Sequence, residues 1–453
     1  MDPLRNHRPL ALALALGCAG AFAGASVAGG DPPARKPAPG AEPRVELLRA
    51  EGIRRYQARE YAQALRAFEE ALAAARGSEA GDLKELVART RSALGLELLS
   101  AGELRQAGTF FREALRESSD AYAHFGLGFI NFLKLEDAVA LEHLEAAARL
   151  DAASTATQKL LGLIDYRRGR TAEALSRMDR ALALDPKDRE AAALKERWTL
   201  ELSAVSGFRE FRRGVAILRA EPAFAEARAG EVFDRLDRAR REIGEALQAE
   251  LGEALVVVLF APDTFHRATK SYHWVGGLYD GQVKLVYPAG DPPAPGELQA
   301  LDEAIRHEIA HVFVRRLCSE CPVWLNEGIA QHFERPGRGA EVASMLRERA
   351  RARIRFEDVP GRLWEVDDEA FARQTYLQGL GFVEFLVERF LEFRLGLLLR
   401  AIHEEGSLKK GFETVYGLSL ESAEVEWWAW VRESGARSPG ASEGASKPPR
   451  GGT

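Results

Sequence analysis

Small residues recur along the first half of the chain at an interval close to 34 residues. Gly128 and Gly162 are one 34-residue period apart, and Gly95 precedes Gly128 by nearly the same distance. Matching positions follow these glycines: one copy reads Gly95, Gly102, Ala107, Phe111 and Ala114, and another reads Gly162, Gly169, Ala174, Ala181 and Pro186. A repeat of this length is typical of two antiparallel helices whose small residues let the backbones approach. Because one such pair cannot bury its apolar face alone, the pattern restricts this region to a stack of helical hairpins.

Two further copies fit the same frame, namely Gly52, Ala64, Phe68 and Ala71, and then Gly128, Ala140, Leu144 and Ala147. The first interval is longer than the others, so we expect an inserted loop from Gly77 to Gly81. Phe68 and Phe111 are expected to fill the gap against the next hairpin. The pattern resembles the tetratricopeptide repeat, which implies an all-α solenoid over residues 44–203, with Arg189–Leu202 as its capping helix. The alternative is a generic helical bundle in which the alanines recur by chance.

A metal-binding pattern follows in the second half of the chain. His307-Glu308-Ile309-Ala310-His311 lies in a segment with helical character, from Asp302 to Leu317. Residues four apart share one helix face, so the two imidazoles can hold one ion while Glu308 reaches a water on that ion. Catalytic zinc usually takes three protein ligands and one open position. The next helical segment, Pro322–Gln331, supplies Glu327 as the obvious third ligand.

The two motifs together, HEIAH and then Trp324-Leu325-Asn326-Glu327-Gly328, resemble the gluzincin class of zinc metallopeptidases, whose best-known fold is that of thermolysin. More narrowly, they resemble exported bacterial proteins that join a peptidase MA-like domain to tetratricopeptide repeats. The resemblance implies an α+β thermolysin-like domain over residues 204–433 and one Zn²⁺ per chain. It also implies that His307, His311 and Glu327 are the ligands and that Glu308 is the general base.

One position departs from that family pattern. Thermolysin-like sites have an Asp four residues after the ligand Glu, where it orients a ligand His, and this chain has Gln331 there. An amide oxygen accepts the imidazole N–H less strongly than a carboxylate, so the histidine would be a weaker base. Gln331 and Asn326 are the residues that we expect beside the ligands. Metal binding follows from the ligand set, whereas catalysis also depends on Gln331.

Peptide hydrolysis also calls for a group that stabilises the oxyanion. Tyr376, in the predicted helix Ala370–Phe390, could direct its hydroxyl to the site, as Tyr or His does in thermolysin-like enzymes. The alternative is a tyrosine packed in the core. His332 and His403 are further candidates, although His332 directly follows Gln331 and should point away from the metal side of its helix.

Cys318 and Cys321 flank Ser319-Glu320 in the turn between the two ligand segments. In an oxidising compartment they could form a disulfide that fixes the angle between the helices. The alternative is a reduced, inert pair, because such short loops are often strained.

Mixed structure is predicted between the repeats and the metal motif. We expect a strand at Phe208–Leu218, a helix at Ala223–Leu251, a buried strand at Ala254–Phe260, and a hairpin at His273–Tyr287 with a type I′ turn at Asp280-Gly281. By the resemblance, Gln282–Tyr287 or its hairpin partner would be an edge strand that pairs with an extended peptide. The alternative is an ordinary meander. Helices are expected at Glu341–Arg353, Leu395–Glu404 and Ala423–Val431, with Trp427, Trp428 and Trp430 in the core.

The N-terminus has the character of an export signal. Arg5, His7 and Arg8 precede an apolar run from Pro9 to Ala28, so residues 1–28 are predicted to be a signal peptide. We therefore expect a protein of the periplasm or cell envelope, or a secreted one. Cys18 is either lipidated or lost with the signal peptide, and contact with a membrane is expected only through lipidation or an uncleaved N-terminal anchor.

Two segments have too little apolar bulk to fold. Residues 29–43, rich in Pro, Gly and Ala, are predicted to be a disordered linker, and residues 434–453, rich in Gly, Ser and Pro, a disordered tail. The regions between these segments form the repeat domain and the metallopeptidase domain described above.

The composition bears on the partners. A net charge of −6 gives no reason to expect a nucleic acid. The sequence favours a zinc metallopeptidase with a protein or peptide substrate and a protein partner bound to the repeats, and leaves endopeptidase and aminopeptidase activity both open. One alternative is a catalytically silent, metal-binding scaffold for protein interactions. Another is metal-assisted hydrolysis of a non-peptide amide.

Overall fold

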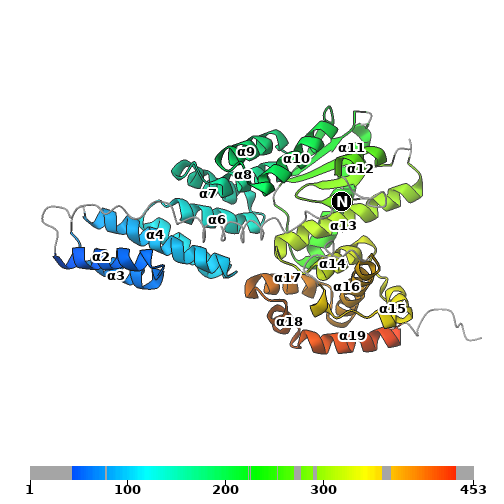
Figure 1. Cartoon of the computed structure of the whole chain (residues 1–453). Helices are drawn as coiled ribbons and strands as arrows, with labels where there is room; N and C mark the ends of the chain where they lie inside the picture. The colour runs from blue at the N-terminus through cyan, green and yellow to red at the C-terminus, as the bar shows by residue number, and fades with distance from the viewer. Residues whose placement is uncertain are drawn as a thin grey trace, which may run out of the picture.

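The computed structural model describes residues 43–76, 79–222, 224, 226–252, 254–269, 277–288, 293–359 and 369–434. The predicted signal peptide, most of the predicted linker and the tail from residue 435 lie outside these residues. Figure 1 shows an elongated helical arm that joins a larger body containing a sheet and further helices.

The arm consists of helices that pack against their neighbours in sequence. They are α2 (Pro43–Gln57), α3 (Tyr61–Ala74), α4 (Glu79–Ser100), α5 (Leu104–Glu117), α6 (Ala121–Leu133), α7 (Asp137–Leu150), α8 (Thr155–Arg167), α9 (Thr171–Leu184) and α10 (Arg189–Ala204). Within the arm, the most extensive contacts are those of the pairs α2–α3, α4–α5, α6–α7 and α8–α9. In Figure 1, α2, α3 and α4 lead away from the body, whereas α8 and α10 lie beside the sheet. The N-terminal region is therefore helical throughout its described residues.

The recurring glycines leave room for large side chains of the neighbouring helices. A β-carbon on Gly52 would be 2.4 Å from Cε1 of Phe68, and one on Gly95 would be 2.6 Å from Cε1 of Phe111. Phe111 also reaches the next pair, because a β-carbon on Gly126 would be 2.2 Å from its Cε2 atom. The expected loop at Gly77–Gly81 is wrong at its C-terminal end, since Gly81 lies within α4. Assignment of these pairs to tetratricopeptide repeats stays a prediction.

A five-stranded mixed sheet follows the arm, in the order β1-β2-β3-β5-β4. Its strands are β1 (Arg209–Arg213), β2 (Ala216–Ala220), β3 (Leu255–Phe260), β4 (Gly277–Tyr279) and β5 (Val283–Val286). The single strand predicted at Phe208–Leu218 is wrong, because the chain reverses at Gly214, which has a φ of 57°, and β1 pairs antiparallel with β2. The buried strand predicted at Ala254–Phe260 is confirmed as β3.

The predicted hairpin forms, with a different turn. Tyr279 pairs with Val283, so Asp280, Gly281 and Gln282 make a three-residue loop in place of a two-residue type I′ turn. Gly281 supplies the positive φ, 114°, that this loop requires. β5 lies between β3 and β4, so Gln282–Tyr287 is not the edge segment; its hairpin partner β4 occupies the edge.

The remaining helices complete the body. They are α11 (Glu226–Leu247), α12 (Pro262–Thr269), α13 (Pro295–Leu317), α14 (Val323–Glu334), α15 (Gly339–Glu348), α16 (Glu369–Phe390), α17 (Phe393–Glu405), α18 (Leu408–Tyr416) and α19 (Leu420–Ser434). α11 and α13 share one core with the sheet and the C-terminal helices. Trp427 and Trp428 are buried in that core, as predicted. Among the described residues, no helix is long and apolar enough to cross a membrane.

A buried ion cluster ties α14 to the C-terminal helices. His332 of α14 places Nδ1 2.7 Å from Oε1 of Glu384 and Nε2 2.9 Å from Oε1 of Glu392. Burial alone would lower the pKa of His332, but its hydrogen bonds to the two carboxylates outweigh that effect and raise the pKa to about 9. His332 therefore faces away from the candidate metal ligands and has a structural contact of its own.

This cluster predicts a pH-dependent stability. Because the folded-state pKa lies above the unfolded value of about 6.5, the stabilisation is complete below pH 6.5 and is lost as the pH rises through about 9. We expect His332→Gln to lower the free energy of unfolding by up to about 3 kcal/mol at pH 6, and by much less at pH 10. Denaturant unfolding of both proteins at the two pH values measures this. An equal deficit at pH 6 and pH 10 would contradict the charged-histidine interpretation.

Candidate metal centre

Helix α13 directs two imidazoles to one point. His307 and His311 are one turn apart on its face, with ring centroids 4.8 Å apart. Their Nε2 atoms lie 3.1 Å from each other. Two zinc–nitrogen bonds of about 2.0–2.1 Å at a tetrahedral angle would separate two nitrogens by about 3.3 Å. The imidazoles are therefore spaced as two ligands of one ion would be.

Glu327 approaches the same point from α14. Its Oε2 lies 3.8 Å from Nε2 of His307 and its Oε1 lies 3.8 Å from Nε2 of His311. Ligand atoms of the three residues all lie within 4.8 Å of one another. In the part of the chain that the structure describes, this is the one such group of three His, Cys, Asp or Glu side chains. Two imidazoles and a carboxylate suit zinc, and the three side chains are partly exposed.

The outer nitrogens of both imidazoles have partners. Nδ1 of His307 lies 3.0 Å from Oε2 of Glu334, and Nδ1 of His311 lies 3.0 Å from Oδ1 of Asn326. A carboxylate can only accept, so Nδ1 of His307 carries the hydrogen and its Nε2 lone pair points at the centre. The partners thus orient the rings and make them better ligands.

Glu334 makes the hydrogen bond that the family pattern led us to expect from Gln331. It follows Glu327 by seven residues, two helical turns, so both carboxylates lie on one face of α14. The i+7 spacing was visible in the sequence and could have revealed this residue. Asn326 lies beside His311, where we expected a supporting residue.

Substitutions in α14 can distinguish these two positions. We expect Glu334→Gln to weaken zinc affinity by about 10- to 100-fold, because His307 loses its carboxylate partner. Gln331→Ala, on the same helix, should change the affinity much less. Competition with a fluorescent zinc chelator measures both values. A larger loss from Gln331→Ala would assign the orienting role to the amide after all.

Glu308 is enclosed next to the candidate ligands. It is 5% exposed, and burial, together with the nearby Glu327, raises the pKa of its carboxyl to about 8 despite the opposing effect of His311. Edge strand β4 passes directly over it, since a β-carbon on Gly277 would be 2.7 Å from Oε1 of Glu308. This carboxyl would be within reach of a water bound at the candidate ligands. It would also be within reach of a peptide that pairs with β4.

Comparison with known proteins bears on this arrangement. Residues 273–433 match the Peptidase MA superfamily. This segment, hereafter the Peptidase MA region, contains β4, β5, both ligand helices and all the C-terminal helices. Members of that superfamily are usually zinc-dependent peptidases, so the match indicates a peptidase, in keeping with the His-His-Glu group. No curated protein matches the chain.

Tyr376 belongs to α16, which meets α14 backbone to backbone. A β-carbon on Gly328 of α14 would be 2.5 Å from the carbonyl oxygen of Gly379, and one on Gly379 of α16 would be 2.3 Å from that of Trp324. Tyr376 stands one turn before Gly379. Burial, and then the negative charge of Glu327, raise the pKa of Tyr376 well above its usual range. Its hydroxyl is therefore protonated at neutral pH and close enough to sense a candidate ligand.

Cys318 and Cys321 are both free cysteines in the structure. Cys318 directly follows α13, and the amide of Cys321 donates to its carbonyl oxygen over 3.3 Å in a tight turn. The two side chains are neighbours, since burial and the Cys318 thiol both raise the pKa of Cys321. The predicted disulfide is not formed here, and its formation in an oxidising compartment stays a prediction.

Proposed function

We propose that this protein is a zinc-dependent peptidase whose active site lies between α13, α14 and edge strand β4. The observation that carries the proposal is the convergence of His307, His311 and Glu327 within 4.8 Å. The match of residues 273–433 to the Peptidase MA superfamily supports the same reaction class.

The chain's own residues have distinct roles in this proposal. A zinc ion held by the three ligands would lower the pKa of a water and polarise the scissile carbonyl. Glu308 accepts a proton from the attacking water and donates it to the leaving amine, a role that fits a carboxyl beside the ligands but outside their set. β4 binds the substrate by main-chain pairing, because it is the sheet edge that passes over Glu308.

Tyr376 is proposed to stabilise the oxyanion. Its protonated hydroxyl can donate a hydrogen bond, and the influence of the Glu327 charge on its pKa supports a position on the metal side of α16. His332 is a poor alternative, because both of its ring nitrogens are hydrogen-bonded to Glu384 and Glu392.

We also propose an exported location for the protein and a binding role for its arm. The basic and apolar N-terminal segment supports export to the periplasm, the cell envelope or the medium. The paired helices of the arm, with glycines at their crossings, support a tetratricopeptide-repeat solenoid that binds a protein partner.

The experiment is digestion of casein and of a peptide library by the purified protein. We expect about one zinc per chain and cleavage that stops when 1,10-phenanthroline is added and returns when zinc is restored. Cleavage that persists in the chelator, with no zinc in the protein, would overturn the metallopeptidase proposal. One zinc per chain without cleavage of any substrate would favour the metal-binding scaffold.

A further inference from the structure

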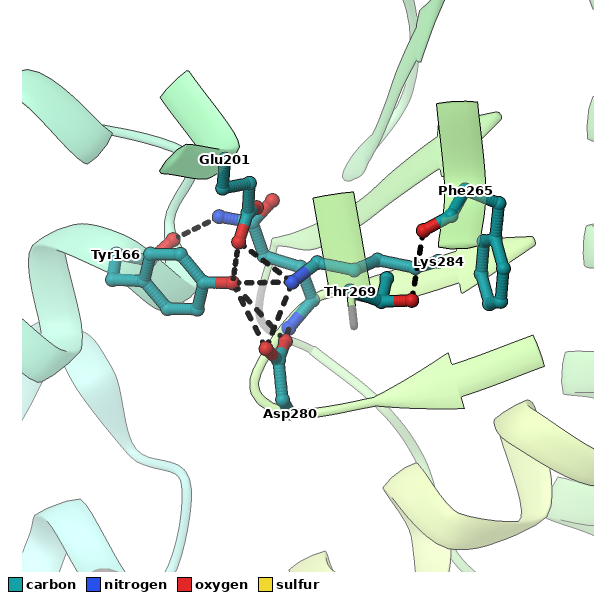
Figure 2. A network of polar contacts seen from close by, with 7 residues as sticks. Tyr166, Glu201, Phe265, Thr269, Asp280 and Lys284 are labelled. Atoms are coloured by element: carbon teal, nitrogen blue, oxygen red, sulfur yellow. Dashed lines mark hydrogen bonds and ion pairs between the residues drawn. The ribbon is translucent and has the colours of Figure 1, made fainter. Parts of the chain in front are cut away.

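The tip of the β4–β5 hairpin is buried against the helical arm. Figure 2 shows Tyr166 of α8 and Glu201 of α10 facing Asp280 of the hairpin loop and Lys284 of β5. Tyr166, Glu201 and Lys284 are each at most 3% exposed. Side chains from the arm and from the Peptidase MA region therefore share one desolvated polar cluster.

The ammonium of Lys284 is fully hydrogen-bonded within this cluster. Nζ of Lys284 donates to Oε2 of Glu201 over 2.7 Å, to Oδ2 of Asp280 over 2.8 Å and to the hydroxyl of Tyr166 over 2.7 Å, which uses all three of its hydrogens. The Tyr166 hydroxyl also lies 2.8 Å from Oε2 of Glu201 and 3.1 Å from Oδ2 of Asp280. Buried ion pairs of this kind fix geometry, because separating them leaves an uncompensated charge.

A main-chain atom of the arm also binds the hairpin loop. The side-chain amide of Gln282 donates to the carbonyl oxygen of Tyr166 over 2.6 Å, so the loop is bound on both sides of Gly281. The ring of Tyr166 is itself fixed by stacking on Trp198, with centroids 4.7 Å apart. The arm thus presents a rigid surface to the hairpin tip.

The anchored loop is continuous with the strand at the candidate site. Asp280 directly follows β4, and Lys284 is the cross-strand partner of Leu278. Gly277, at the other end of this short strand, lies over Glu308. Three residues of extended chain span only about 10 Å, so a shift of the loop would be transmitted to the strand above Glu308.

We propose that Tyr166 and Glu201 are positioning residues, through which the arm holds β4 beside Glu308. This inference rests on the proposed function, because it assigns β4 to substrate alignment. The arm is then part of the peptidase architecture as well as a binding surface for partners, and a ligand that displaces α8 or α10 would also displace β4.

Tyr166→Phe is the direct test, because it removes one hydroxyl and leaves Lys284 paired with Asp280 and Glu201. We expect amide hydrogen exchange in residues 277–285 to become about tenfold faster, since a buried hydrogen bond is lost. For a peptide substrate, KM should rise about tenfold while kcat stays within about twofold, because pairing with β4 is made in the ground and transition states alike. Zinc content should be unchanged.

Tyr56→Phe is the matched control. Tyr56 follows Gly52 by four residues, just as Tyr166 follows Gly162, and its hydroxyl is buried in the arm away from the hairpin. This variant should leave both the exchange of residues 277–285 and KM as in the wild type. Asp280→Asn should reproduce the effect of Tyr166→Phe from the other side of the contact.

Several results would overturn the inference: unchanged exchange in Tyr166→Phe, faster exchange with an unchanged KM, or equal effects from Tyr56→Phe. If the wild type cleaves no peptide at all, the proposed function fails on its own. The exchange measurement, which needs no substrate, then decides whether Tyr166 anchors β4.

Discussion

Glu308→Gln is expected to abolish peptide hydrolysis while the protein keeps its zinc. Glu308 lies outside the group of His307, His311 and Glu327, so an amide in its place removes the proton acceptor without removing a ligand. General-base catalysis contributes about 10²- to 10⁴-fold, and we expect a loss of about 10³-fold in kcat. Cleavage of casein and zinc content by atomic emission, measured on the same preparation, check both parts.

The fold should tolerate this substitution. Burial raises the pKa of Glu308 to about 8, which favours the neutral carboxyl when the centre holds no metal, and glutamine is close to that form in shape and charge. Glu303→Gln, five residues earlier on α13 and outside the ligand group, is the control and should retain full activity. If Glu308→Gln were as active as the wild type, Glu308 would not be the general base.

His307→Ala is expected to remove the metal. Without one imidazole the centre keeps two ligands, His311 and Glu327, and catalytic zinc usually needs three from the protein. We expect zinc to fall from about one per chain to below about 0.1 after dialysis, with no peptidase activity. Loss of the imidazole also leaves Glu334 without its partner, so some loss of stability should accompany it.

His403→Ala provides the comparison for that substitution. His403, an oxyanion candidate from the sequence, lies on α17 outside the His-His-Glu group, and the charged groups that act on it are Lys134 and Glu404. Its removal should therefore leave zinc content and activity unchanged. Zinc is measured in wild type and both variants purified in parallel. A His307→Ala protein that still holds about one zinc would mean that the metal is bound elsewhere in the chain.

The candidate metal ligands could be predicted from sequence because their geometry is local. His307 and His311 are four residues apart on one helix, and helical periodicity alone sets both imidazoles on one face. Glu327 could be predicted as the third ligand because only a short turn separates its helix from that of the histidines. The residue that orients His307 was harder to predict, because the family pattern drew attention to Gln331, whereas the packing angle of α14 on α13 brings Glu334 to Nδ1 of His307.

The order of the strands in the sheet could not be predicted from the sequence, because it also depends on long-range contacts. The apolar alternation around Asp280-Gly281 predicted a hairpin, and a hairpin looks the same whichever strand lies at the edge. β5 pairs with β3 through Val257–Phe260, and this long-range contact leaves β4 at the edge of the sheet. The contact of Lys284 with Glu201 could not be predicted either, because the two residues are 83 positions apart in the chain.

The helical pairs of the arm, the candidate ligands and Glu308 could be predicted from the sequence, because each depends on spacings within one or two elements. The hydrogen bond of Glu334 to His307, the influence of Glu327 on Tyr376 and the contact of the arm with the β4–β5 hairpin appear only in the folded chain. Those contacts join elements far apart in the chain, and they exist because close helix crossings at glycines and buried charge pairs fix the angles between elements.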